Sequence, residues 1–148
     1  MSIKLQIQDA MKEAMKAKQQ ARLECLRMAK GALLLKEKES AKDTEISDEV
    51  AILTLRSEVR KRQQAVEQFV ELGKADEAEA YRIEIAVLEE FLPRQLTPEQ
   101  IEEKVRAYVA AHPEVNHAGK LTGALKKELG DLADGKLLAD TCAKVLAG

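Results

Sequence analysis

The scarcity of helix-breaking residues is the strongest constraint on how this chain can fold. Of its 148 residues seven are glycine and three are proline, and two of the prolines, Pro93 and Pro98, lie five positions apart. The remainder is rich in Ala, Glu, Lys, Leu and Arg, which is typical of long helices. No run of Val, Ile or Thr alternates strictly with polar residues, so strands are not expected. The sequence therefore predicts an all-α protein.

The first 92 residues predict a long helical hairpin or bundle. Apolar residues recur at three- and four-residue steps from residue 3 to about residue 41, where we expect a single long helix. A turn is expected at residues 42–47. Two further helices are predicted, from about Asp48 to Leu72 and from about Ala75 to Glu90.

Local signals define the ends of the helix expected from Asp48 to Leu72 and mark one position in the helix expected from residue 3 to about residue 41. Ser47 can accept hydrogen bonds from the first backbone amides of the second helix, and Gly73 suits the left-handed conformation that follows a helix. Gly31 lies inside the first helix, where it costs about 1 kcal/mol relative to alanine, so it indicates close packing of another helix. The buried face of the second helix is expected to come from Val50, Leu53, Val59, Val66, Phe69 and Val70.

A domain boundary is predicted where the sequence reads FLPRQLTPEQ, at residues 91–100. Pro93 disfavours helical geometry at the residue before it. Thr97, Pro98 and Gln100 together form a capping box with proline at the first helical position. We therefore expect an N-terminal helical domain over residues 1–92 and a small three-helix domain over residues 93–148. Its helices are predicted from Pro98 to about Ala111, from about His117 to Leu129, and from a cap at Asp134 through Ala147.

The formal charge is −2, but the charges are unevenly distributed along the chain. Residues 1–42 hold ten Lys and Arg against five Asp and Glu, residues 43–92 hold six against thirteen, and residues 93–148 hold eight of each. Two interpretations stay open. The basic and acidic segments could pair as neighbouring helices, or the basic segment could bind nucleic acid.

The sequence does not present a catalytic constellation. His112 and His117 lie in one expected loop, without further ligands at the spacing of a metal site. Cys25 and Cys142 are far apart and are expected to be core residues in a reducing compartment. Phosphate-binding, dinucleotide-binding and serine-hydrolase motifs are missing from the sequence. We therefore expect no active site, no cofactor and no metal.

The sequence also predicts where the protein resides. The N-terminus lacks the apolar region of a secretory signal, and no segment approaches the length of a membrane-spanning helix. We therefore expect a cytoplasmic protein that does not bind membranes.

The most informative candidates for binding are two Gly-Lys pairs, Gly119-Lys120 and Gly135-Lys136. Each is expected at the start of a helix, where backbone N–H groups suit phosphate. The alternative is that both glycines are simply helix-end residues and that the lysines are only solvated. The RNA-binding candidates are Gly119, Lys120, Lys126, Lys127, Gly135 and Lys136.

A secondary basic face is predicted on the second helix, at Arg56, Arg60 and Arg62. Arg56 and Arg60 are four residues apart and share a side of that helix. Ion pairing with the surrounding glutamates is the preferred interpretation there. The sequence pI of about 5.8 is low for a nucleic-acid-binding domain, which counts against the lysines of the C-terminal part as a binding patch when they are taken alone. DNA is not an expected partner.

Three segments resemble the GatB/YqeY family and together cover essentially the whole chain: residues 22–33 (RLECLRMAKGAL), residues 57–101 and residues 119–140. The most specific matches are the aromatic-Leu-Pro-x-Gln-Leu junction at residues 91–96 and the Ala-Asp-Gly-Lys sequence at residues 133–136. Order and spacing agree as well as composition. Members of the family often have Gly-Arg before Ala-Asp-Gly-Lys, whereas this chain has Asp131-Leu132.

The resemblance implies a two-part helical protein whose C-terminal part is similar to the tail of the B subunit of glutamine-dependent aminoacyl-tRNA amidotransferase. In that enzyme the tail contacts tRNA and the chemistry lies in other domains. The family is described as carbon–nitrogen ligases with glutamine as amido-N-donor. This chain, however, lacks both the catalytic cradle of the B subunit and the amidase machinery of the A subunit.

The function expected from the resemblance is that of a non-catalytic helical module. Its expected partner is tRNA, or a tRNA-modifying enzyme such as an amidotransferase or a synthetase. The alternative is a protein–protein adaptor that uses the long N-terminal helices and does not bind RNA. The sequence leaves open the RNA species, the protein partner and the oligomeric state.

Overall fold

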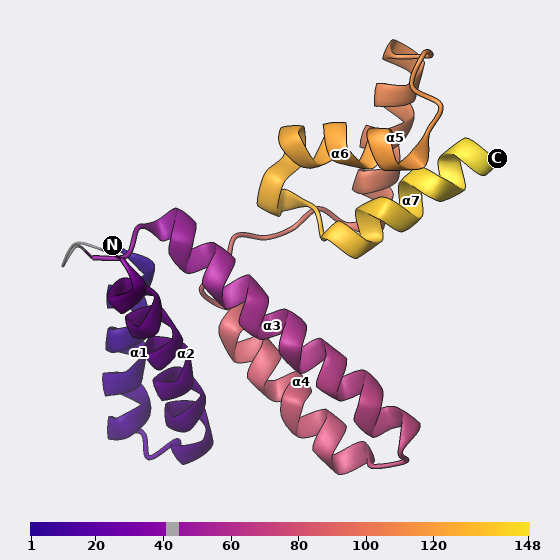
Figure 1. The fold of residues 1–148 in the computed structure, drawn as a ribbon. Helices are drawn as coiled ribbons and strands as arrows, with labels where there is room; N and C mark the ends of the chain where they lie inside the picture. The colour runs from indigo at the N-terminus through magenta and orange to yellow at the C-terminus, as the bar shows by residue number, and fades with distance from the viewer. Residues whose placement is uncertain (41–44) are drawn as a thin grey trace. The chain divides into compact units, whose positions relative to one another are not determined.

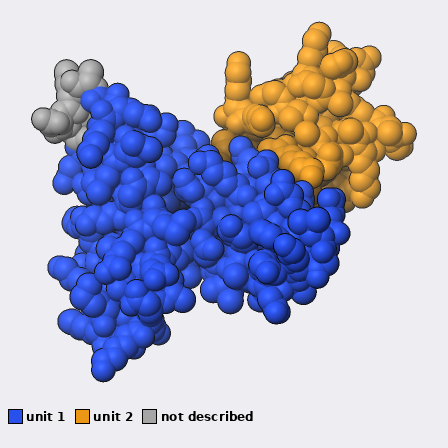
Figure 2. All heavy atoms as spheres, turned by 60° about the horizontal axis from the view of Figure 1, so that its bottom comes forward, with its two compact units in different colours: residues 1–92 blue, residues 93–148 orange. Residues whose placement is uncertain are grey.

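Helices form nearly all the regular structure of the chain. A computed structural model describes residues 1–40 and 45–148, and within these ranges it contains helices and no strands, so the all-α prediction is confirmed (Figure 1). The described residues divide into two compact units, Met1–Leu92 and Pro93–Gly148, coloured separately in Figure 2.

Unit 1 contains two helical hairpins. The helices α1 (Ile3–Lys16) and α2 (Gln20–Glu39) pack against each other, as do α3 (Asp48–Glu71) and α4 (Ala75–Glu89), and α2 also contacts both α3 and α4. Figure 1 shows the two hairpins as separate pairs of helices that diverge from each other. The apolar core lies where the hairpins meet, and its fully buried side chains include Ile7, Leu26, Leu33, Leu55 and Leu88.

The prediction of one helix from residue 3 to about residue 41 is wrong, because the chain reverses direction at Lys18. Lys18 has a φ of 57°, its N–H donates to the carbonyl of Met15, and the N–H of Gln19 donates to the carbonyl of Ala14. These two bonds and a left-handed residue define the Schellman motif that ends many helices. Glycine usually occupies the left-handed position, so a lysine there gives no sequence signal of a turn.

The ends of α3 agree with the sequence signals. The N–H of Val50 donates to Oγ of Ser47, which confirms the expected cap, and Gly73 has a φ of 72° directly after the helix. The turn expected at residues 42–47 lies partly outside the described residues. At this end of the unit Glu37 accepts from Nζ of Lys4 at 2.9 Å and from the N–H of Ile46 at 2.9 Å. These hydrogen bonds, the first from Lys4, lower the pKa of Glu37.

The buried face of α3 differs from the predicted one. Val59 is buried, but Val50, Leu53 and Val70 are 40%, 65% and 53% exposed. The face that packs inward instead contains Ala51, Thr54, Leu55, Val59 and Arg62. The prediction missed this face because it contains an arginine, which interrupts the apolar pattern, and an alanine, which contributes little to it.

Unit 2 contains α5 (Pro98–Ala111), α6 (Ala118–Leu129), the short 3-10 helix η1 (Gly130–Leu132) and α7 (Gly135–Ala147). The capping box predicted at Thr97 and Gln100 is present. The residues after Pro93 are bound to η1, since the N–H of Leu96 donates to the carbonyl of Leu132 at 2.7 Å. The three α-helices enclose a second core, which includes Ile101, Val105, Leu121, Leu125, Leu138 and Cys142.

The left-handed turn at Lys18 gives a testable consequence for stability. Lys18→Gly removes the steric cost of a side chain at positive φ, which is about 1 kcal/mol after the greater flexibility of unfolded glycine is included. We expect Lys18→Gly to raise the free energy of unfolding by up to about this amount, measured by urea unfolding of the full chain. Lys18→Ala removes the same charge and keeps the strain, so an equal effect of both substitutions would contradict this interpretation.

Candidate nucleic-acid interface

The first Gly-Lys pair lies at a helix start that is already capped. Nδ1 of His117 accepts from the N–H of Gly119 at 3.1 Å and from the N–H of Lys120 at 3.4 Å. A Cβ at position 119 would lie 3.1 Å from Cε1 of His117, so any other residue would require the imidazole to shift by a few tenths of an ångström. The amides of this pair therefore bind the protein's own histidine, and Gly119 serves the cap.

The second Gly-Lys pair lies at a more accessible helix start. Asp134 caps α7 through the N–H of Leu137 at 3.0 Å, as the sequence predicted. Gly135 and Lys136 are the first two residues of α7, and their backbone N–H groups donate no hydrogen bond to an acceptor within the described part of the chain. The first amides of a helix lack partners within the helix and point outward along its axis.

Lys126 reaches from α6 to the start of α7. Its Cε and Nζ lie 3.4 and 3.6 Å from the point that a Cβ of Gly135 would occupy. The ammonium of Lys126 can approach the helix start because residue 135 has no side chain. Lys126 thus places its ammonium beside the first residue of α7, directly before Lys136, and this helix N-terminus is itself electropositive.

The other candidate lysines lie along α6. Lys120 and Lys127 are exposed and seven residues apart, so they share a side of the helix and are separated by about 10.5 Å along its axis. No carboxylate in the described residues forms an ion pair with any of the four candidate lysines. By contrast, Lys144 on α7 lies 3.5 Å from Glu102, and its charge is the main reason that the pKa of Glu102 is lowered.

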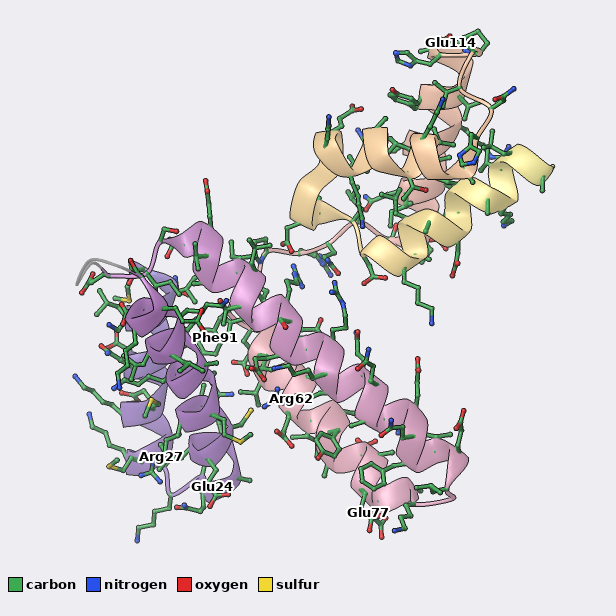
Figure 3. All side chains as sticks on the ribbon, viewed as in Figure 1. Glu24, Arg27, Arg62, Glu77, Phe91 and Glu114 are labelled. Carbon is green, nitrogen blue, oxygen red and sulfur yellow. The ribbon has the colours of Figure 1, made fainter. Side chains whose placement is uncertain are left out.

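Arg62 is buried and forms ion pairs inside unit 1, so it is not a surface cation. Its Nε lies 3.1 Å from Oε1 of Glu84 and its Nη1 lies 2.9 Å from Oε2 of Glu58, so it joins α3 to α4 (Figure 3). Only 7% of its side chain is exposed. Burial acts to lower the pKa of Arg62, but the hydrogen bonds that it donates to Glu58 and Glu84 raise the pKa overall. The interpretation of this residue as ion-paired is therefore confirmed.

The other two members of the predicted basic face are more accessible than Arg62. Arg60 is exposed and Arg56 is half-buried. The basic N-terminal segment is also partly compensated, since Arg22 donates two hydrogen bonds to Glu90, at 2.6 and 3.1 Å. The Glu90 hydrogen bond raises the pKa of Arg22.

The cysteines and His112, whose side chains are capable of covalent chemistry, are buried or packed against other side chains. Cys25 is buried, its Sγ contacts the carbonyl of Glu84 at 3.7 Å, and burial raises the pKa of its thiol. Cys142 is fully buried. The ring of His112 stacks on Tyr108. Across residues 1–40 and 45–148, no group of three or more His, Cys, Asp and Glu could hold a metal ion, and no helix is long and apolar enough to cross a membrane.

Comparison with known proteins identifies the family. The profile described as Yqey-like protein matches residues 4–146, which is almost the entire chain, and no match was found among curated proteins. The chain therefore belongs to the YqeY-like family, and the resemblance seen in the sequence is confirmed.

The ion pairs of Arg62 give a prediction for unit 1. Arg62→Ala removes the buried guanidinium that Glu58 and Glu84 share, and we expect it to lower the free energy of unfolding by about 3 kcal/mol. This is the low end of the range for buried pairs, because both glutamates remain partly exposed. The exposed Arg60→Ala, with the same change of charge, should change it by less than about 0.5 kcal/mol. Urea unfolding of both variants tests this, and equal effects would contradict the structural role of Arg62.

Proposed function

We propose that this protein is a non-catalytic tRNA-binding module whose RNA-binding surface is centred on the start of α7. The observation that supports this most strongly is the proximity of the Lys126 ammonium to Gly135, the residue directly before the exposed Lys136. A backbone phosphate placed there would meet two ammonium groups and the outward-pointing amides of Gly135 and Lys136.

The electrostatic balance at this position favours an anion. The carboxylate of Asp134 contributes one negative charge, and it is engaged by the N–H of Leu137. Lys126 and Lys136 contribute two positive charges, and the helix N-terminus adds roughly half a charge more. The sum is positive, so a phosphate would be attracted, and because the lysines are exposed the attraction would weaken with salt.

The arrangement of the lysines suits a polymer of phosphates better than a single anion. Lys120 and Lys127 extend the positive surface along α6, about two helical turns from one to the other. A polyanion can contact several of these side chains at once, whereas inorganic phosphate contacts one place. The family resemblance to the tRNA-contacting tail of the amidotransferase B subunit favours tRNA as the polyanion.

Position 132 explains why this member of the family would bind RNA more weakly than relatives with arginine there. Leu132 is the last residue of η1, directly before Ala133 and the Asp134 cap, and is 44% exposed. An arginine side chain at this position would reach solvent close to the start of α7. If the arginine of relatives contacts phosphate, leucine here removes one such contact, and Asp131 beside it adds a negative charge.

Reversing the charges of Lys126 and Lys136 tests the proposal. We expect Lys126→Glu with Lys136→Glu to weaken binding of bulk tRNA by about tenfold or more at low salt. The slope of log K against log salt should fall in magnitude by about 1.4 to 1.8, since each phosphate contact contributes about 0.7 to 0.9. Fluorescence anisotropy of labelled tRNA across a salt series measures both quantities.

Two further variants make this experiment specific. Lys74→Glu with Lys104→Glu changes the net charge by the same amount at exposed lysines outside the surface, and it should leave tRNA binding nearly unchanged. Leu132→Arg should strengthen binding and increase the salt slope. Equal loss in both double variants would show that only net charge matters, and no tRNA binding by the unmodified protein at low salt would overturn the proposal.

A further inference from the structure

The α1–α2 hairpin carries more positive than negative charge. Residues 1–40 contain nine Lys and Arg against five Asp and Glu. Four of the nine cations form ion pairs: Lys4 with Glu37, Lys16 with Glu13, Lys36 with Glu39, and Arg22 with Glu90. Internal pairing, one of the two interpretations that the sequence left open for this basic segment, therefore accounts for only part of its charge.

The other five cations form no ion pair within the described part of the chain. They are Lys12, Lys18, Arg27, Lys30 and Lys38. Two carboxylates of the hairpin are also without an ion pair there, Asp9 and Glu24, and Glu24 accepts from the side-chain amide of Gln20 at 3.3 Å. The unpaired charges of the hairpin thus leave it with an excess of positive charge.

Three of these cations follow one line along α2. Lys30, Leu34 and Lys38 are four residues apart and Arg27 precedes Lys30 by three, so the four side chains share a side of the helix. The line extends about 16.5 Å along the helix axis. Figure 3 shows Arg27 on the α1–α2 hairpin. We call this line the α2 ridge and define it by Arg27, Lys30 and Lys38.

Lys30 is the member of the α2 ridge whose charge is least solvated. It is half-buried, whereas Arg27 and Lys38 are exposed. Its ammonium forms neither a hydrogen bond nor an ion pair with any described residue. Solvent and salt screen a partly buried charge less than an exposed one, so an anion at this position would be attracted more strongly than at either end of the ridge.

The chemistry of the α2 ridge suits a nucleic acid better than another protein. Protein interfaces have centres enriched in aromatic residues and depleted in lysine, but residues 1–68 contain no Phe, Tyr or Trp. Interfaces with nucleic acids are instead polar and rich in positive charge. Cations spread over about 16.5 Å also exceed the reach of a single phosphate, which favours a chain of phosphates.

The α3–α4 hairpin restricts the part of unit 1 on which RNA can lie. Residues 43–92 hold six Lys and Arg against thirteen Asp and Glu. The exposed carboxylates near the α3–α4 turn include those of Glu67, Glu71, Asp76 and Glu77. Phosphates are repelled by such a surface. Within unit 1 the α1–α2 hairpin is therefore the part whose charge suits RNA.

We propose that the α2 ridge is a second RNA-binding surface, on which Arg27, Lys30 and Lys38 contact phosphates of an RNA strand. The guanidinium of Arg27 can donate two parallel N–H groups to one phosphate, and the two lysines act as point charges. The ridge lies in unit 1 and the surface at the start of α7 lies in unit 2, so this proposal goes beyond the proposed function and can be tested separately.

Arg27→Glu with Lys38→Glu tests the α2 ridge in the full chain. Both side chains are exposed and unpaired in the described residues, so the variant should keep its helical circular dichroism. We expect binding of bulk tRNA to weaken by about fivefold or more at low salt. The slope of log K against log salt should fall in magnitude by about 1.4 to 1.8, because two phosphate contacts are lost. Fluorescence anisotropy of labelled tRNA measures both quantities.

A matched control exchanges the same residue types on the acidic hairpin. Arg60→Glu with Lys74→Glu also replaces one arginine and one lysine at exposed positions, and it should leave the affinity and the salt slope nearly unchanged. Equal losses in this control and in the ridge variant would overturn the proposal, because only net charge would then matter.

The same titration of Lys126→Glu with Lys136→Glu distinguishes the two surfaces. Weaker binding in both this variant and the ridge variant supports two surfaces. Weaker binding in the ridge variant alone also supports the α2 ridge and counts against the surface at the start of α7. Weaker binding in the Lys126 and Lys136 variant alone overturns the α2 ridge as an RNA surface and leaves it to an acidic protein. No tRNA binding by the unmodified protein overturns both.

Discussion

The buried guanidinium of Arg62 is the interaction on which the arrangement of unit 1 depends. It connects α3 and α4 through Glu58 and Glu84, two acidic residues that would otherwise repel each other across the helix pair. Arg22 of α2 forms an ion pair with Glu90, which directly follows α4 of the same hairpin. Arg22 and Arg62 are thus paired with carboxylates inside unit 1. Lys120, Lys126, Lys127 and Lys136 on α6 and α7 are exposed and form no ion pair within the described residues.

Much of the fold could be predicted because caps and breakers act locally. Ser47, Thr97 and Asp134 cap the helices that the sequence assigned to them, and Gly73 ends α3. The turn at Lys18 could not be predicted in this way. Its left-handed residue is a lysine, and no glycine marks the position in the sequence. The buried face of α3 was missed for a related reason, since ion pairing allows Arg62 to occupy a position that apolar periodicity assigns to aliphatic residues.

The candidate site was only partly predictable from the sequence. The two Gly-Lys pairs look equivalent in the sequence, and both lie at helix starts. The structure distinguishes them, because His117 occupies the amides of the first pair, whereas Lys126 reaches the start of the second. Residues 126 and 135 are nine positions apart in different helices, so their proximity depends on the turn at η1. A histidine two residues before Gly119 was the available signal for the cap.

Chemical-shift mapping of the isotope-labelled full chain during titration with tRNA tests the central claim most directly, because it reports binding at each backbone amide. If tRNA binds at the start of α7, we expect the largest changes at Lys126, Gly135 and Lys136, with smaller changes at Gly119, and we expect added salt to reverse them. Changes concentrated on the basic residues of α1 and α2, with none at the start of α7, would contradict it.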